Sequence, residues 1–162
     1  MMAVGLICVI VIAAADLYMK YYVEKHVKQD EERSTCGRRW ILRKVHNHGL
    51  MMNQLEKYPR VIRAASLAAM GILLIWQGIL NRKPGHILEK IGTALMTGGA
   101  VSNTYDRIKR GYVVDYFSFK TRFKKLEKIT FNLGDFAIFA GALAVFTGTA
   151  FSALAEFVMG KE

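Results

Sequence analysis

The chain has 162 residues, of which 52% are hydrophobic, yet its formal net charge at pH 7 is +10. A soluble domain mixes these classes at helical or strand period, whereas here they form separate blocks, which argues against a soluble domain. The length suits one domain, residues 1–162. A basic chain can bind nucleic acid, but no helix-turn-helix, zinc-ligand or aromatic RNA-reading pattern is present. We therefore expect no nucleic-acid partner, and basic loops that touch anionic lipid.

Four apolar stretches predict four membrane-spanning helices, at about residues 2–23, 61–80, 88–105 and 131–159. The first has some 22 residues, enough to cross ~30 Å of hydrocarbon at 1.5 Å rise per residue. It could also be a cleaved signal peptide, but no Lys or Arg precedes it, so we favour a span. The fold class is therefore an all-α membrane protein, a bundle of four transmembrane helices.

The last two stretches are rich in small residues. Ala94 and Gly98, and likewise Ala137 and Gly141, lie one helical turn apart. Small residues at this spacing let helix backbones approach closely in lipid, which predicts a compact bundle.

Two connections are long and polar, residues 24–60 and 106–130, whereas the connection through Pro84 and Gly85 is a short turn. The first contains WILRKVHNHGLMMNQL, which could form short strands, and apolar residues alternate after Gly111 in the second. The connection between the second and third spans is short. The two long connections therefore lie on one membrane face, where we expect the polar site.

Cysteine and histidine give no metal signature. Cys8 lies in an apolar run and Cys36 in a charged one, so neither a disulfide nor a metal site is indicated. His46 and His48 lack a third ligand at a convincing spacing, and no metal site is predicted.

Carboxylates at a membrane boundary are costly and therefore candidates for function. Asp115 lies between apolar neighbours that hold it close to the bilayer. Two further groups share a helix face through i, i+3 or i+4 spacing, and these are Asn103, Asp106 and Arg107, and Asn132 with Asp135.

If the last two helices are antiparallel neighbours, Asp115 can face Asp135. Two close carboxylates share a proton, so one can deprotonate a water while the other donates to a carbonyl oxygen. This is the chemistry of an aspartic protease. The structural alternative is that Asp106 pairs with Arg107 or a loop lysine, while Asp115 and Asp135 cap or anchor helices.

Asp16 and Lys20 stand at i, i+4, the favourable order for an ion pair on a helix. They could close the polar end of the first span, or they could support the catalytic end of the bundle.

Four motifs in this order, DLYMK, NHG, GGAVSNTYDRIKRGYVVDYF and FNLGD, resemble those of the lipoprotein signal peptidase (signal peptidase II) family. They spread over nearly the whole chain. The resemblance implies a four-span aspartyl protease with a small β-rich platform from the first long connection. It implies cleavage of prolipoproteins just before a diacylglyceryl-modified cysteine, in a bacterial plasma membrane, with neither metal nor organic cofactor.

By this resemblance Asp115 and Asp135 would be the catalytic pair. The residues that would bind substrate or support the pair are Asn47, Gly49, Asn103, Asp106, Arg107, Asn132, Asp16 and Lys20.

Three departures from the family pattern touch the site. Ser102 stands where the family usually has Gly, Gly134 stands where it usually has Ala, and NHGLMM replaces small residues followed by Phe. They motivate a second hypothesis, a non-catalytic relative that binds lipidated chains. A third is a structural or transport membrane protein, although no inverted repeat is present. An active protease remains the favoured interpretation.

The charge pattern conflicts with the orientation that the resemblance implies. Residues 20–60 carry 10 and residues 106–130 carry 8 of the 23 Lys and Arg residues, so the positive-inside rule places the long connections in the cytoplasm. The family topology places them, and the active site, near the extracytoplasmic face. We follow the resemblance, and labelling of Cys36 by an impermeant maleimide would test it.

Overall fold

The computed structural model describes residues 2–29, 31–35, 39–50 and 54–159. The labelling position Cys36 and both methionines of the NHGLMM stretch lie outside these residues.

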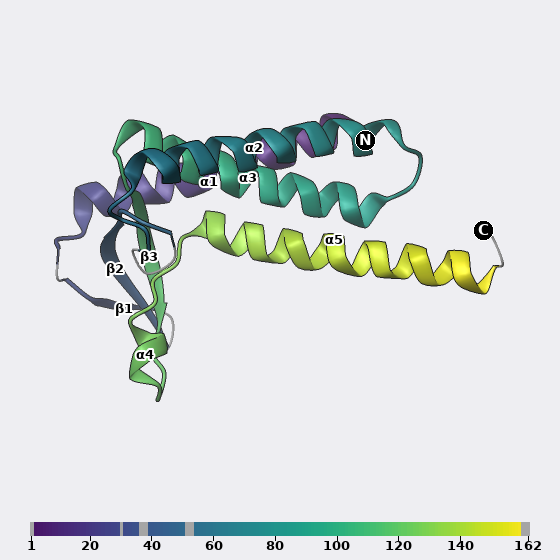
Figure 1. Cartoon of the computed structure of the whole chain (residues 1–162). Coiled ribbons are helices and arrows are strands. Elements are labelled where there is room, and N and C mark those ends of the chain that lie inside the picture. Colours follow the sequence, from purple (N-terminus) through teal and green to yellow (C-terminus); the bar gives the residue numbers. More distant parts are fainter. Residues whose placement is uncertain (1, 30, 36–38, 51–53, 160–162) are drawn as a thin grey trace.

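Four long helices pack into a bundle, as predicted (Figure 1). They are α1 (Met2–His26), α2 (Pro59–Arg82), α3 (Ile87–Lys109) and α5 (Leu133–Val158). Helix α3 is central, because it packs against α1, α2 and α5. The first three helices continue beyond the apolar stretches seen in the sequence, and α5 begins two residues later than predicted because Asn132 caps it.

The surface of the bundle is apolar and its interior is polar. Large apolar side chains are exposed along α5, including Phe139 at 73% and Phe151 at 75%, whereas Asp16 and Lys20 are fully buried. A largely apolar surface around a polar interior is typical of a protein surrounded by lipid, and the chain is a multi-pass membrane protein. Among the described residues, three helices, α1, α2 and α5, are long and apolar enough to span a membrane by themselves.

Helix α3, the third predicted span, does not reach that apolarity. It buries Glu89, Lys90, Asn103 and Asp106 against its neighbours. Its polar side chains are therefore covered by the other helices, and the polar chemistry of the bundle lies along α3.

Small residues bring α3 and α5 close together, as the sequence indicates. A Cβ atom at Gly92 would lie 2.6 Å from the carbonyl oxygen of Gly141, so the two backbones are nearly in contact. Gly98 faces α1 instead, where a Cβ atom would lie 2.9 Å from Ile12. The small residues thus serve two interfaces of α3.

A small antiparallel sheet lies at one end of the bundle, beside the last turn of α1 and the first turn of α5 (Figure 1). Its strands are β1 (Arg33–Thr35), β2 (Trp40–Asn47) and β3 (Val113–Phe119), in the order β1-β2-β3. The first two come from the first long connection, as the platform prediction requires. The third comes from the second connection, where alternation predicted an extended segment, and the short helix α4 (Lys124–Glu127) follows it.

The sheet is attached to the bundle by a buried cluster. Val23 of α1 and Val27, which directly follows this helix, pack against Val114 and Tyr116 of β3. On the strands, Val45 pairs with Asp115 and Asn47 pairs with Val113. This register places the Asn47 side chain next to that of Asp115, at the end of the bundle where α3 ends and α5 begins.

Candidate active site

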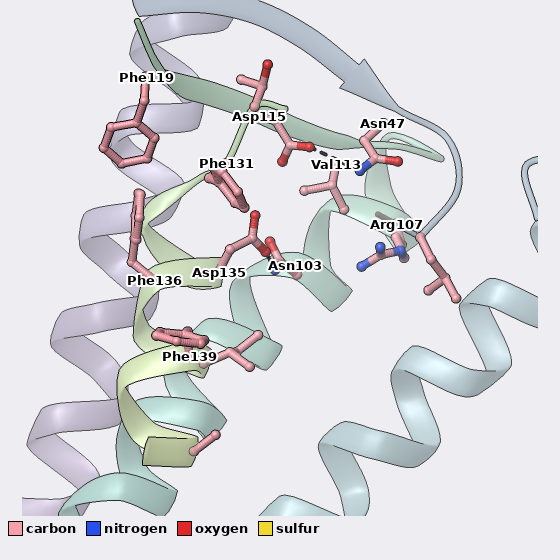
Figure 2. A pocket seen from close by; sticks show the side chains of 14 residues that line it. Asn47, Asn103, Arg107, Val113, Asp115, Phe119, Phe131, Asp135, Phe136 and Phe139 are labelled. Atoms are coloured by element: carbon pink, nitrogen blue, oxygen red, sulfur yellow. Dashed lines mark hydrogen bonds between the residues drawn. The ribbon is translucent and has the colours of Figure 1, made fainter. Parts of the chain in front are cut away.

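A cavity of about 590 Å³ lies where the sheet meets the bundle. Its walls come from β2, β3, the last turns of α3 and the first three turns of α5 (Figure 2). The lining has a polar group and an apolar group. The polar side chains are Asn47, Asn103, Arg107, Asp115 and Asp135, and the apolar ones include Phe119, Phe131, Phe136, Ile138, Phe139 and Ala142.

Asp115 on β3 is 3% exposed, and both of its carboxyl oxygens accept amide hydrogen bonds. The Asn132 side chain donates to Oδ1 at 2.7 Å and the Asn47 side chain donates to Oδ2 at 3.0 Å. Burial raises the pKa of Asp115 to about 7, and the negative charge of Asp135 adds to this, while both amides lower it. A carboxyl group with this pKa can hold a proton near neutral pH.

Asp135 lies in the first turn of α5 and forms a capping box with Asn132. The Asn132 backbone N–H donates to Oδ2 of Asp135 at 3.1 Å, and the Asp135 backbone N–H donates to the Asn132 side chain at 2.8 Å. The Asn103 amide donates to the other carboxyl oxygen at 2.9 Å. Asp135 therefore caps a helix, as the structural alternative predicts, and also lines the cavity with Asp115.

Arg107 reaches from α3 to the loop after β2. Its terminal nitrogen Nη2 donates to the carbonyl oxygen of Gly49 at 3.1 Å, and the Gly49 N–H donates to Asn47 Oδ1 at 3.1 Å. The Nε atom of Arg107 is buried and has no hydrogen-bond partner among the described residues. The sequence prediction that Asn47, Gly49 and Arg107 belong to one site agrees with this arrangement.

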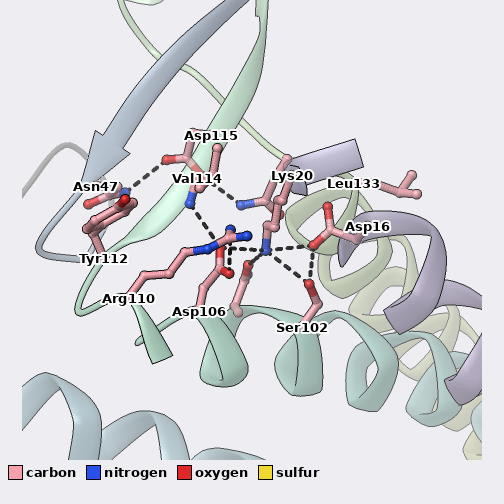
Figure 3. Close-up of polar contacts among 12 residues, drawn as sticks. Asp16, Lys20, Asn47, Ser102, Asp106, Arg110, Tyr112, Val114, Asp115 and Leu133 are labelled. Atoms are coloured by element: carbon pink, nitrogen blue, oxygen red, sulfur yellow. Dashed lines mark hydrogen bonds and ion pairs between the residues drawn. The ribbon is translucent and has the colours of Figure 1, made fainter. Parts of the chain in front are cut away.

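A buried polar network lies behind the cavity (Figure 3). The Lys20 ammonium lies 2.7 Å from Asp16 Oδ2 and 3.7 Å from Asp106 Oδ2, and all three side chains are fully buried. It also donates to Ser102 Oγ at 3.0 Å and to Asn103 Oδ1 at 2.7 Å. Asp16 and Lys20 form the predicted ion pair, and Asn103 connects Lys20 to Asp135.

Asp106 does not line the cavity. Its carboxylate accepts the backbone N–H of Val114 at 3.1 Å and the Arg110 guanidinium at 2.9 Å. It thus holds the start of β3 against the end of α3. Its cationic partners are Arg110 and Lys20, so the alternative pairing with Arg107 is wrong.

The sequence interpretation missed Tyr116. Its hydroxyl group donates to Asp16 Oδ1 at 2.8 Å and accepts the backbone N–H of Leu133 at 3.0 Å, so it joins α1 to the start of α5. Burial raises the pKa of Tyr116, and the Asp16 carboxylate raises it further. The strand alternation could have identified it, because Tyr116 must point away from the face that carries Asp115.

The two histidines of the NHG region, His46 and His48, both pack against Tyr112, which directly precedes β3. His46 Nε2 lies 2.8 Å from a carboxyl oxygen of Glu24, and the His46 ring stacks on Tyr112 with a centroid separation of 4.1 Å. Among the residues that the structure describes, no group of three His, Cys, Asp or Glu side chains is placed to hold a metal ion.

Two solved structures share this fold. Both are described as bacterial membrane enzyme structures obtained by the in meso method, one at 2.3 Å and one at 1.9 Å resolution. The first aligns with a TM-score of 0.78 and 17% identity over 99% of this chain and 92% of the other. The second aligns with a TM-score of 0.72 and 16% identity over 91% of this chain and 92% of the other. At these identities the match concerns the fold alone.

The sequence comparisons identify the family. The chain is 30% identical over 139 residues to the lipoprotein signal peptidase of Moorella thermoacetica, covering 85% of this chain and 87% of that protein. It is 29% identical over 153 residues to the lipoprotein signal peptidase of Francisella tularensis subsp. mediasiatica, covering 90% of this chain and 91% of that protein. A family model described as signal peptidase (SPase) II matches residues 8–151. The chain therefore belongs to the signal peptidase II family.

Proposed function

We propose that this protein is an aspartic endopeptidase that removes the signal peptide from diacylglyceryl-modified prolipoproteins, by cutting just before the lipidated cysteine. One observation carries the proposal. Two carboxyl groups line one cavity, that of Asp115, which is buried, and that of Asp135, which is half-buried, and Asn132 contacts both of them through hydrogen bonds.

The two carboxyl groups have environments suited to opposite roles. Asp115, with its pKa raised to about 7, is the member that holds the proton. Asp135 accepts N–H donors on both oxygens in the first turn of a helix, where negative charge is favoured. We assign Asp115 as the acid and Asp135 as the base.

Hydrolysis then needs one water molecule between the two groups. Asp135 takes a proton from the water, and the water oxygen forms a bond to the scissile carbonyl carbon. In the same step Asp115 gives its proton to the carbonyl oxygen. In the second step the carbon–nitrogen bond breaks. Asp135 passes its proton to the leaving nitrogen, and a hydroxyl group of the intermediate returns a proton to Asp115. Atoms and charges balance, and the pair returns to its starting state.

The apolar half of the cavity supports a lipid-modified substrate. Phe136, Ile138, Phe139 and Ala142 continue the cavity along α5 toward the exposed apolar surface of that helix. Acyl chains can enter such a groove from the bilayer, and the lipidated cysteine would then place its peptide bond near the two carboxyl groups.

Two polar groups could orient the peptide. The buried Nε–H of Arg107 has no partner among the described residues, so it is available to a substrate carbonyl oxygen. Asn47 lines the cavity from the sheet, and Gly49 joins it to Arg107. We assign both to substrate positioning.

The test uses purified protein in detergent with a diacylglyceryl-modified prolipoprotein, followed by gel shift. Asp115→Asn and Asp135→Asn should abolish cleavage. The control is Glu156→Gln. Glu156 lies far along the same helix as Asp135, so this variant should cleave at the parent rate. A substrate that lacks the lipid should be cut much more slowly, because it cannot fill the apolar groove.

A different outcome would favour the second hypothesis. If the parent protein bound the lipidated substrate without cutting it, while another member of the family cut the same preparation, the protein would be a non-catalytic relative. Cleavage by the Asp115→Asn variant would instead remove Asp115 from the mechanism.

We also propose that the sheet and the cavity lie at the extracytoplasmic face of a bacterial plasma membrane, against the positive-inside bias. In a cysteine-free background, Arg122→Cys on the second long connection should react with an impermeant maleimide in intact cells. Lys83→Cys, at the α2–α3 turn, should react only after lysis. The reverse result would place the cavity in the cytoplasm.

A further inference from the structure

Ser102 completes the hydrogen bonding of a buried ammonium group. A lysine side chain has three N–H donors, and those of Lys20 have three acceptors within 3.0 Å, namely Asp16, Asn103 and Ser102. The Ser102 hydroxyl group donates its own hydrogen to Asp16 Oδ2 at 2.6 Å. Ser102 is fully buried, so no solvent can replace it.

The same oxygen of Asp16 lies against the backbone of α5. A Cβ atom at Gly134 would lie 2.8 Å from Asp16 Oδ2 and 3.0 Å from the Asn132 side-chain oxygen. Any other residue at this position must therefore displace either the Asp16 carboxylate or the cap of α5. Ser102 and Gly134 thus meet at one atom, the Oδ2 of Asp16.

Two paths lead from the Asp16 carboxylate to the carboxyl pair, one from each of its oxygens. In one, Lys20 donates to the Asn103 oxygen, so that the Asn103 amide nitrogen must face Asp135, to which it donates at 2.9 Å. In the other, Asp16 accepts the Tyr116 hydroxyl, which accepts the N–H of Leu133 beside the capping residue Asn132. The position of Asp16 therefore affects both Asp135 and the first turn of α5.

We propose that Ser102 and Gly134 are coupled positioning residues, which together fix Asp16 and Lys20 and thereby orient Asp135. Neither residue lines the cavity, so neither touches substrate. The effect on cleavage rests on the proposed function, whereas the coupling through Asp16 can be measured without it.

The first test separates positioning from substrate binding. Ser102→Ala removes one acceptor of Lys20 and one donor to Asp16, which should lower kcat about tenfold while KM stays unchanged. Thr97→Val is the matched control. Thr97 is also fully buried on α3, but its hydroxyl group bonds only to the carbonyl oxygen of Thr93 in its own helix. The control should keep the parent kcat.

The second test measures the coupling. Gly134→Ala alone should lower kcat more than tenfold and lower the unfolding temperature, because its methyl group meets Asp16. In the double variant Ser102→Gly/Gly134→Ala, the carboxylate can move into the space that the serine side chain leaves. The double variant should therefore cleave faster and unfold at a higher temperature than Gly134→Ala alone. Gly71→Ala, where a Cβ atom meets nothing within 4 Å, is the control for adding a methyl group.

Independent effects would overturn the proposal. The double variant is compared with Ser102→Gly alone and Gly134→Ala alone. If these two single changes combined multiplicatively in kcat and additively in unfolding temperature, the residues would not be coupled. If the unfolding temperatures showed coupling but Ser102→Ala kept the parent kcat, Ser102 would be only structural. If the parent cut no lipidated substrate, the proposed function and the catalytic role of the pair would both fail. The unfolding temperatures would still decide the coupling.

Discussion

Asn132 and Asp135 cap each other at the start of α5, and the same Asn132 side chain also holds Asp115. Its oxygen accepts the Asp135 N–H at 2.8 Å, and its nitrogen donates to Asp115 at 2.7 Å. The side-chain amide therefore holds a helix terminus and the Asp115 carboxyl group at once, while the Asn132 backbone N–H donates to the Asp135 carboxyl group. Helix capping and the geometry of the site can be separated by substitution, because only one of these roles needs the amide nitrogen.

Replacing Asn132 by Ser should separate these two roles. A serine hydroxyl group caps a helix about as well as asparagine, but it cannot also donate to Asp115. Asn132→Ser should keep an unfolding temperature near that of the parent, while kcat falls at least about tenfold. Asn132→Ala should lose the activity and, in addition, about 1 kcal/mol of stability from the missing cap. Equal unfolding temperatures for the two variants would contradict the capping role.

The pH dependence of cleavage follows from Asp115. Its pKa is raised to about 7 by burial and by the charge of Asp135, so its acid form is lost as pH rises through this value. The plot of kcat/KM against pH should therefore fall on its alkaline side near pH 7.

The Asn47 side chain affects the pH at which kcat/KM falls, that is, the position of the alkaline limb of this plot. It lowers the pKa of Asp115 by hydrogen bonding to the ionised form, so Asn47→Ala should raise the pKa and move the alkaline limb to higher pH. The profile is measured with a lipidated peptide under kcat/KM conditions. A limb that stayed in place would show that another group controls it.

Lys20 should be essential for stability. Replacing it by Met leaves Asp16 and Asp106 fully buried, with no cation within 4 Å of Asp16 among the residues that the structure describes, and such losses cost about 3–5 kcal/mol. Thermal unfolding in detergent should show a large decrease for Lys20→Met. Arg33→Met is the control, because its ion pair with Glu31 is partly exposed to solvent, and it should lower the unfolding temperature much less. Comparable decreases for both variants would contradict a special role of the buried pair.

The apolar groove should be sensitive to added volume. Ala142 lines the cavity, whereas the exposed Ala140 on the same helix does not. Ala142→Phe should raise KM for the lipidated substrate about tenfold or more, because the ring occupies space that the acyl chains need. Ala140→Phe should change neither kcat nor KM. An unchanged KM for Ala142→Phe would place the acyl chains elsewhere.

Much of the bundle could be predicted from the sequence, because membrane spans appear in it as long apolar stretches. The lengths of α1, α2 and α5 followed from this rule. The boundaries did not, because the end of a helix depends on capping contacts such as that of Asn132. The third strand of the sheet was expected only as an extended segment, since strand pairing between Asn47 and Val113 joins two distant connections.

The polar residues of the site could be selected by type and spacing, but their partners could not. The i, i+3 and i+4 spacing of Asn103, Asp106 and Arg107 predicted one shared face. In the structure Asn103 and Arg107 line the cavity, and Asp106 turns toward Val114. The role of Tyr116 depends on contacts with Asp16 and Leu133, which come from two other elements. Strand alternation indicates the face on which Tyr116 lies, but these contacts depend on tertiary structure.

The polar character of α3 has a consequence for biogenesis. This helix carries buried Glu89, Lys90 and Asp106, and it is not among the helices apolar enough to span a membrane by themselves. A newly made α3 would therefore leave the translocation machinery only when neighbouring helices can shield it. Helix α2, which a short turn joins to α3, enters the membrane before α3, whereas α5 is made last. Insertion of α3 should thus stay incomplete until synthesis is nearly finished, which couples completion of the active site to completion of the chain.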